Sequence, residues 1–145
     1  MSLIGVASAD SVWRGMEYYE DKMVASWNEA ADGTYDGMVE GSNGNSYVVH
    51  VDKIHPRKST CTCPFAAGRR VVCKHMIALY FTAEPKVAED LKKRVENWER
   101  EEEERAKQHY DDLRKYVNSL KKRELQMQLY DALVELEEIK NRRWY

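Results

Sequence analysis

The sequence contains no run of about 18 apolar residues, which is the length that a helix needs to cross a bilayer. It also shows no apolar signal region after its first residues. Both observations lead us to expect an intracellular, cytoplasmic protein without a membrane partner. Residues 1–3 resemble the leading residues that expression vectors add, so the fold prediction leaves them aside.

Cysteine is also scarce, because the chain holds only Cys61, Cys63 and Cys73. An odd number of closely spaced cysteines makes a poor disulfide framework, and a reducing compartment favours metal binding instead. A metal site built on three thiolates needs a fourth ligand, and His75 stands two positions after Cys73. The alternative is that these are ordinary buried or free cysteines, but two ligand pairs within fifteen positions make that interpretation the weaker one.

The ligand pairs are Cys61-x-Cys63 and Cys73-x-His75, with nine residues between them. Zinc prefers four sulfur and nitrogen donors in a tetrahedron, so the sequence predicts one Zn²⁺ held by these four side chains. Four protein ligands leave no coordination position for water or substrate, which makes the site structural. The chain shows no paired nucleophile and base and no phosphate-binding loop, so we expect no enzyme.

Positive charge gathers around the cysteines. Residues 50–75 carry a net charge of +5, whereas residues 1–49 carry −6 and residues 76–145 carry −1. This asymmetry favours an anionic partner, and we expect nucleic acid or a protein that acts on nucleic acid. The predicted contact residues are Arg57, Lys58, Phe65, Arg69, Arg70 and Lys74. Two alternatives stay open, namely that the basic side chains only solvate a loop and that Phe65 belongs to a small core.

The periodicity of apolar residues predicts an α+β fold. Turn signals at Asp32-Gly33 and Asn43-Gly44 separate three strands of an antiparallel sheet. A helix precedes the sheet, and another begins near Cys73 and ends before Pro85. The expected elements are a helix over 10–21, strands over 23–27, 34–40 and 47–52, and the helix from residue 73.

After Pro85 the chain becomes strongly charged and predicts two long helices, over about 86–117 and about 120–143. In the second helix Leu125, Leu129, Leu133, Leu136 and Ile139 fall on one face. Such a stripe is typical of an intramolecular or dimer core, so a homodimer through these helices is a further expectation. We therefore divide the chain into a domain over 9–85 and a helical extension over 86–145.

The arrangement C-x-C followed by C-x-H resembles the signature of the SWIM zinc-finger family. The segment Trp13-Arg14-Gly15 and the hairpin over 34–52 are similar to the family's leading helix and strands, so the resemblance covers about 9–85. It extends to the tail of some small bacterial members over 118–144. The resemblance implies a ββα-type module with Zn²⁺ on the same four ligands, and proposed binding of nucleic acid or protein. No motif of the remodelling ATPases or transposases in this family appears, so only the binding role carries over.

Three hypotheses follow from the sequence. The favoured one is a zinc-binding adaptor that docks nucleic acid, or a protein acting on it, through a basic finger surface. The second is a purely structural interaction protein that uses its C-terminal helices. The third is a thiol redox switch in which Cys61 and Cys63 form a disulfide and release zinc.

Overall fold

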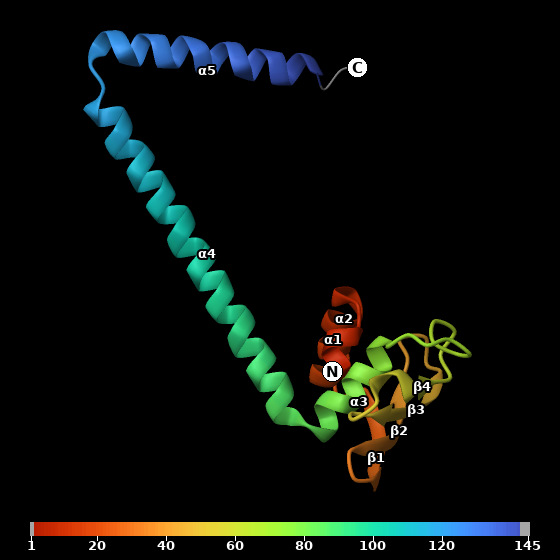
Figure 1. The fold of residues 1–145 in the computed structure, drawn as a ribbon. Helices are drawn as coiled ribbons and strands as arrows, with labels where there is room; N and C mark the ends of the chain where they lie inside the picture. Colours follow the sequence, from red (N-terminus) through yellow and green to blue (C-terminus); the bar gives the residue numbers. More distant parts are fainter. Residues whose placement is uncertain (1, 143–145) are drawn as a thin grey trace. The chain divides into compact units, whose positions relative to one another are not determined.

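An antiparallel sheet and the helices that cover it form the first of two units in the chain, as the computed structural model of residues 2–142 shows (Figure 1). This first unit ends at Arg94, and the second begins at Val95. The first unit contains α1 (Leu3–Val6), α2 (Ala9–Glu20), β1 (Val24–Ala31), β2 (Thr34–Glu40), β3 (Ser46–Asp52), the 3-10 turn η1 (Pro56–Lys58), β4 (Thr60–Cys61) and α3 (Lys74–Ala83). Helix α4 (Pro85–Ser119) starts in the first unit and continues into the second, where α5 (Lys122–Arg142) follows.

The sheet has the order β1-β2-β3-β4 with antiparallel neighbours, so the predicted α+β class and three-stranded meander are confirmed. The structure adds a fourth strand that the sequence did not predict. Strand β4 is two residues long and pairs Cys61 with Val49 of β3. This pairing carries the first metal-ligand residue onto the sheet. Strand β1 also extends beyond the predicted residue 27, because it pairs with β2 up to Ala31 although most of its residues are exposed.

Helix α3 supplies the centre of the core. Met76, Ile77, Leu79 and Phe81 are fully buried, and the helix contacts β1, β2 and β3 on one side and α2 on the other. Gly15 of α2 makes the close crossing possible, because a Cβ atom there would stand 2.4 Å from Cβ of Ile77. Any side chain at position 15 would therefore push α2 away from α3 and disrupt the packing of the two helices.

The N-terminus of the described chain belongs to this core. Leu3 is 0 % exposed and packs in the same buried cluster as α3. Ser2 caps α1 by accepting a hydrogen bond from the backbone N–H of Gly5, 3.1 Å from its Oγ. Leu3, which the sequence prediction left aside, is therefore part of the folded core.

The junction of α3 and α4 lies where the sequence predicts it, since α3 ends at Ala83 and Pro85 is the first residue of α4. Glu84, between the two helices, accepts hydrogen bonds from Lys53 and from the Tyr35 hydroxyl. These two hydrogen bonds lower the pKa of the Glu84 carboxyl, and the bond from Lys53 has the larger effect. Beyond the junction Ala88 is buried, so the first turns of α4 belong to the first unit.

In the described residues, the second unit contains the rest of α4 and all of α5. All side chains of α5 that the structure describes are exposed. The expected helices over about 86–117 and 120–143 correspond to α4 and α5, while residues 143 and 144, which the predictions included, lie outside the described residues. None of the helices within residues 2–142 combines the length and apolar character that a membrane span requires.

Candidate metal centre

Two short segments bring the four predicted ligands together. Cys61 ends β4 and Cys63 lies two positions later, while Cys73 is the N-cap of α3 and His75 lies in the first turn of that helix. Each of the four side chains is at most 4 % exposed. One ligand atom from each lies within 4.8 Å of the others, so the cluster is able to hold one metal ion.

The donor distances suit zinc. The Nδ1 atom of His75 lies 3.8 Å from Sγ of Cys61 and 3.9 Å from Sγ of Cys73. In a tetrahedron with Zn–S of about 2.3 Å and Zn–N of about 2.0 Å, a nitrogen and a sulfur donor stand roughly 3.5 Å apart, so both distances lie within a few tenths of an ångström of that spacing. The chemistry of the donors also suits zinc. The cluster consists of three free cysteines and one histidine, which are the soft and borderline ligands that structural zinc sites use. The residues therefore fit one Zn²⁺, with Nδ1 as the histidine ligand.

Two tyrosines fix the orientation of the histidine. The ring of Tyr47 lies 4.7 Å from that of His75 at an angle of 35°, and the ring of Tyr18 lies 5.3 Å away at 67°. His75 Nε2 is buried and has no hydrogen-bond partner within residues 2–142. The aromatic contacts from β3 and α2 thus hold the ring with Nδ1 towards the sulfur atoms.

Local hydrogen bonds shape the first ligand pair. The backbone N–H of Cys63 donates to Sγ of Cys61 at 3.4 Å, and the carbonyl of Cys63 accepts from the N–H groups of Ala66 and Ala67. A tight turn therefore follows Cys63 at once. Farther along the loop Gly68 has a φ of 70°, a left-handed conformation that glycine adopts without strain.

The surroundings of Cys73 favour its thiolate form. A hydrogen bond from the Cys61 thiol lowers the pKa of Cys73; burial opposes this, and His75 and the backbone N–H of Met76 add to the lowering. The same hydrogen bond and burial raise the pKa of Cys61. One thiolate is thus already favoured in the metal-free chain, whereas zinc binding requires that all three cysteines lose their protons.

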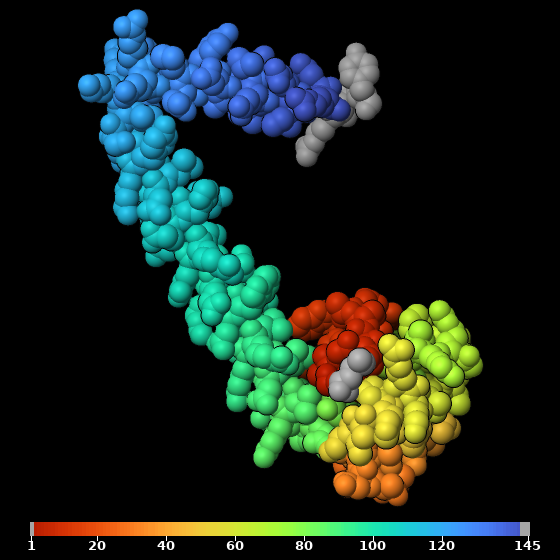
Figure 2. Space-filling view, in the orientation of Figure 1, coloured from red at the N-terminus to blue at the C-terminus, as the bar shows by residue number. Residues whose placement is uncertain are grey.

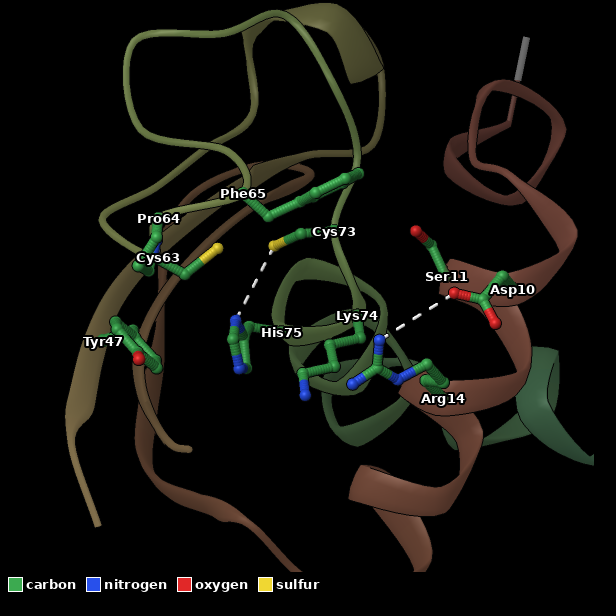
Figure 3. A pocket seen from close by; sticks show the side chains of 10 residues that line it. All are labelled: Asp10, Ser11, Arg14, Tyr47, Cys63, Pro64, Phe65, Cys73, Lys74 and His75. Atoms are coloured by element: carbon green, nitrogen blue, oxygen red, sulfur yellow. Dashed lines mark hydrogen bonds and ion pairs between the residues drawn. The ribbon is translucent and has the colours of Figure 1, made fainter. Parts of the chain in front are cut away.

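The predicted partner contacts fall into separate groups on the surface. Phe65 and Lys74 line a cavity of about 270 Å³ between α2 and the finger loop, which we define as residues 64–72 (Figures 2 and 3). The metal ligands Cys63, Cys73 and His75 also line this cavity. Arg57 and Arg70 line another cavity, of about 400 Å³, beside α1 and η1.

The remaining predicted contacts are placed differently. Lys58 is exposed at the end of η1. The guanidinium of Arg69 lies 5.4 Å from the centroid of the Phe65 ring. Phe65 is 51 % exposed, so the alternative that it belongs to a small core is wrong.

Sequence reasoning gave Arg14 no role as a contact. This residue lies on α2 and lines the cavity together with Lys74, 60 positions away in the sequence. A sequence-local feature of Arg14 is its spacing from Asp10, one helical turn earlier, with which it forms an ion pair at 3.9 Å. A pair of this kind is common on helix surfaces and does not by itself mark a site.

Comparison with known proteins identifies the segment that carries these ligands. Residues 47–84, from β3 to the end of α3, match the family model described as SWIM zinc finger. The match includes all four ligands and does not extend to α2, β1 or β2, for which the sequence suggested a resemblance. No curated protein and no solved structure matches the chain.

Proposed function

We propose that this chain, whose residues 47–84 match the SWIM zinc-finger family model, is a zinc-dependent adaptor that docks nucleic acid. The contact face is its basic finger surface, defined as Arg57, Lys58, Phe65, Arg69, Arg70 and Lys74. The observation that carries the proposal is the contrast between a fully buried ligand set and these largely exposed side chains around it. Buried zinc stabilises the finger, while exposed cations are free to meet an anionic partner.

We also propose that the module binds without catalysing a reaction. Its four protein ligands complete a zinc tetrahedron, which leaves no position at which the metal activates a water or a substrate. The alternative occupant of the finger surface is a protein that acts on nucleic acid.

Binding to nucleic acid should be weak and independent of sequence. Three thiolates on one Zn²⁺ leave a formal net negative charge at the centre, which offsets part of the surrounding positive charge. The cations also divide between separate cavities instead of forming a continuous stripe. Phosphate contacts of this kind position a backbone and carry no base preference.

Replacing Arg69 and Arg70 together by alanine tests this surface. Each phosphate contact contributes about 0.9 to the slope of log affinity against log salt concentration on duplex DNA, so the double variant should show a flatter slope. Fluorescence anisotropy with duplex DNA over several salt concentrations measures it, with zinc content checked in parallel. The matched control is Lys122→Ala with Arg123→Ala in α5, which removes the same charge from the second unit. An unchanged slope, or binding that ignores salt, would point to a protein partner.

A second candidate function concerns the second unit. Helix α5 carries many exposed apolar side chains, among them Leu129 at 61 % and Leu136 at 53 %. At 100° per residue, Leu125, Leu129, Leu133, Leu136 and Ile139 fall on one side, while Met127, Tyr130 and Val134 fall on the opposite side. A single neighbouring helix covers only one of these sides. Two apolar sides on one helix therefore favour a protein–protein role, with a second copy of the chain as the partner.

Sedimentation of the full chain tests the second candidate. Wild-type protein should show a concentration-dependent dimer, and Leu129→Glu with Leu136→Glu should be monomeric, because two charges would enter the apolar contact. Gln126→Glu with Gln128→Glu adds the same charge beside the stripe and should leave the dimer intact. A wild-type chain that stays monomeric at high concentration contradicts this role.

A further inference from the structure

The cavity between α2 and the finger loop combines an aromatic ring with cations from two helices. Its volume is about 270 Å³, close to the lower end of the range of about 300–1,000 Å³ that small-molecule sites occupy. In Figure 3 Phe65 reaches across one side of the cavity from the finger loop. Arg14 of α2 and Lys74 of α3 lie on other sides, so three separate elements contribute to the wall.

We propose that this cavity holds one unpaired nucleotide of a single-stranded nucleic acid, with its base against Phe65 and its phosphate against Arg14 and Lys74. The inference rests on the proposed function and makes it more specific, because it selects single strands over duplexes.

Phe65 has the properties of a stacking platform. Phe65 is 51 % exposed, so a ligand in the cavity can reach its side chain. Arg69 braces the ring, because its guanidinium lies 5.4 Å from the centroid and its Nη1 donates to the Phe65 carbonyl at 3.1 Å. A ring held in this way needs little ordering when a base stacks on it, and every base has a face that stacks.

The two cations are placed to meet a phosphate. Lys74 Nζ lies 4.3 Å from the centroid of the Tyr18 ring, a cation–π contact that holds it beside the cavity. Arg14 pairs with Asp10 at 3.9 Å, but both side chains are more than half exposed. An exposed ion pair of this kind contributes little to stability, so Arg14 is able to leave Asp10 and bind a phosphate instead. The lining contains one carboxylate, that of Asp10, and the two cations. It also contains the metal ligands Cys63, Cys73 and His75, so the phosphate is assigned to the side of the cavity that Arg14 and Lys74 form.

The concave shape favours a single strand. Bases in a duplex are stacked on one another and present only their edges in the grooves, whereas an unpaired base offers its face to an aromatic side chain. The base site is also separate from Arg57 and Arg70, which line the other cavity and remain available for the backbone of either form.

Binding of the zinc-loaded full chain to a labelled oligodeoxythymidine of about twelve nucleotides, and to its duplex with the complementary strand, tests the inference. Wild-type protein should bind the single strand more tightly. Phe65→Leu keeps apolar bulk but loses stacking, so it should weaken single-strand binding by about 5- to 150-fold. Duplex affinity should fall by much less, because paired bases do not offer their faces to Phe65, and zinc content should stay unchanged. Trp98→Leu, which removes an exposed aromatic ring of α4, is the matched control and should change neither affinity.

The outcomes separate the two proposals. Equal binding of both nucleic acids, or single-strand affinity that Phe65→Leu leaves unchanged, overturns the nucleotide site while the proposed function stands. If the wild-type chain binds neither nucleic acid at low salt, the proposed function fails and the nucleotide site fails with it. Arg14→Gln should weaken single-strand binding and reduce its salt slope, and an unchanged slope would contradict the assigned phosphate contact.

Discussion

Cys73→Ser is expected to lose most of the chain's zinc affinity and to release the finger loop. Structural zinc in finger peptides binds with an apparent free energy of about 10–16 kcal/mol at neutral pH, and a serine hydroxyl is a poor replacement for a thiolate ligand. The change should not damage α3 directly. Cys73 is the N-cap of that helix and makes no capping hydrogen bond, whereas serine is a favourable N-cap residue.

The structure narrows the segment that depends on zinc. The sequence alone predicts that metal removal unfolds residues 60–83 locally and leaves much of the helix in the chain intact. In the structure Ile77 and Phe81 of α3 are fully buried, and the helix packs on α2 and the sheet through apolar contacts that need no metal. The loop between Cys63 and Cys73 has few such contacts, because most of its residues are exposed. Zinc loss should therefore release this loop and leave α3 in place.

Amide hydrogen exchange on Cys73→Ser and on chelated wild-type protein measures this effect. Both samples should lose protection in residues 62–72 and keep it in α3, and the agreement between them assigns the loss to the metal. Unchanged exchange in the loop would mean that the site stabilises nothing. Loss of protection throughout α3 would mean instead that the core depends on zinc more widely.

Leu3→Ala should lower the free energy of unfolding of the first unit by about 2–5 kcal/mol, the usual cost of truncating a buried leucine. The reason is that Leu3 is 0 % exposed inside the same cluster as α3, despite its position near the N-terminus. Denaturant unfolding followed by near-UV circular dichroism measures it. Trp13 and Trp27 in the first unit contribute to this signal.

The matched control for this prediction is Ile54→Ala, a similar truncation at a side chain that is 59 % exposed. It should change stability by no more than about 0.5 kcal/mol. Equal effects of the two variants would show that α1 is not part of the folded core.

Local patterns account for the parts of the fold that the sequence predicted. The strand predicted over 34–40 has the same bounds as β2, because a turn signal lies on each side of it, at Asp32-Gly33 and at Asn43-Gly44. The ligands Cys61, Cys63, Cys73 and His75 were predictable because zinc coordination needs donor types and spacings that are visible in one short segment.

The parts that the sequence missed depend on contacts between distant residues. Helix α1 and strand β4 span four and two residues, which is too short for a periodic pattern. Arg14 became a candidate contact only because Gly15 lets α2 approach α3 closely and so places Arg14 beside the finger. The division of the basic residues between two cavities likewise follows from the path of the loop and not from their order in the chain.

Zinc stoichiometry and ligand type, measured on protein purified under reducing conditions without added metal, test the central claim most directly. Elemental analysis should find one zinc per chain, and X-ray absorption at the zinc edge should show three sulfur neighbours at about 2.3 Å and one nitrogen neighbour at about 2.0 Å. Protein without bound metal, or a zinc shell dominated by oxygen, would contradict the assignment of Cys61, Cys63, Cys73 and His75 as the metal centre.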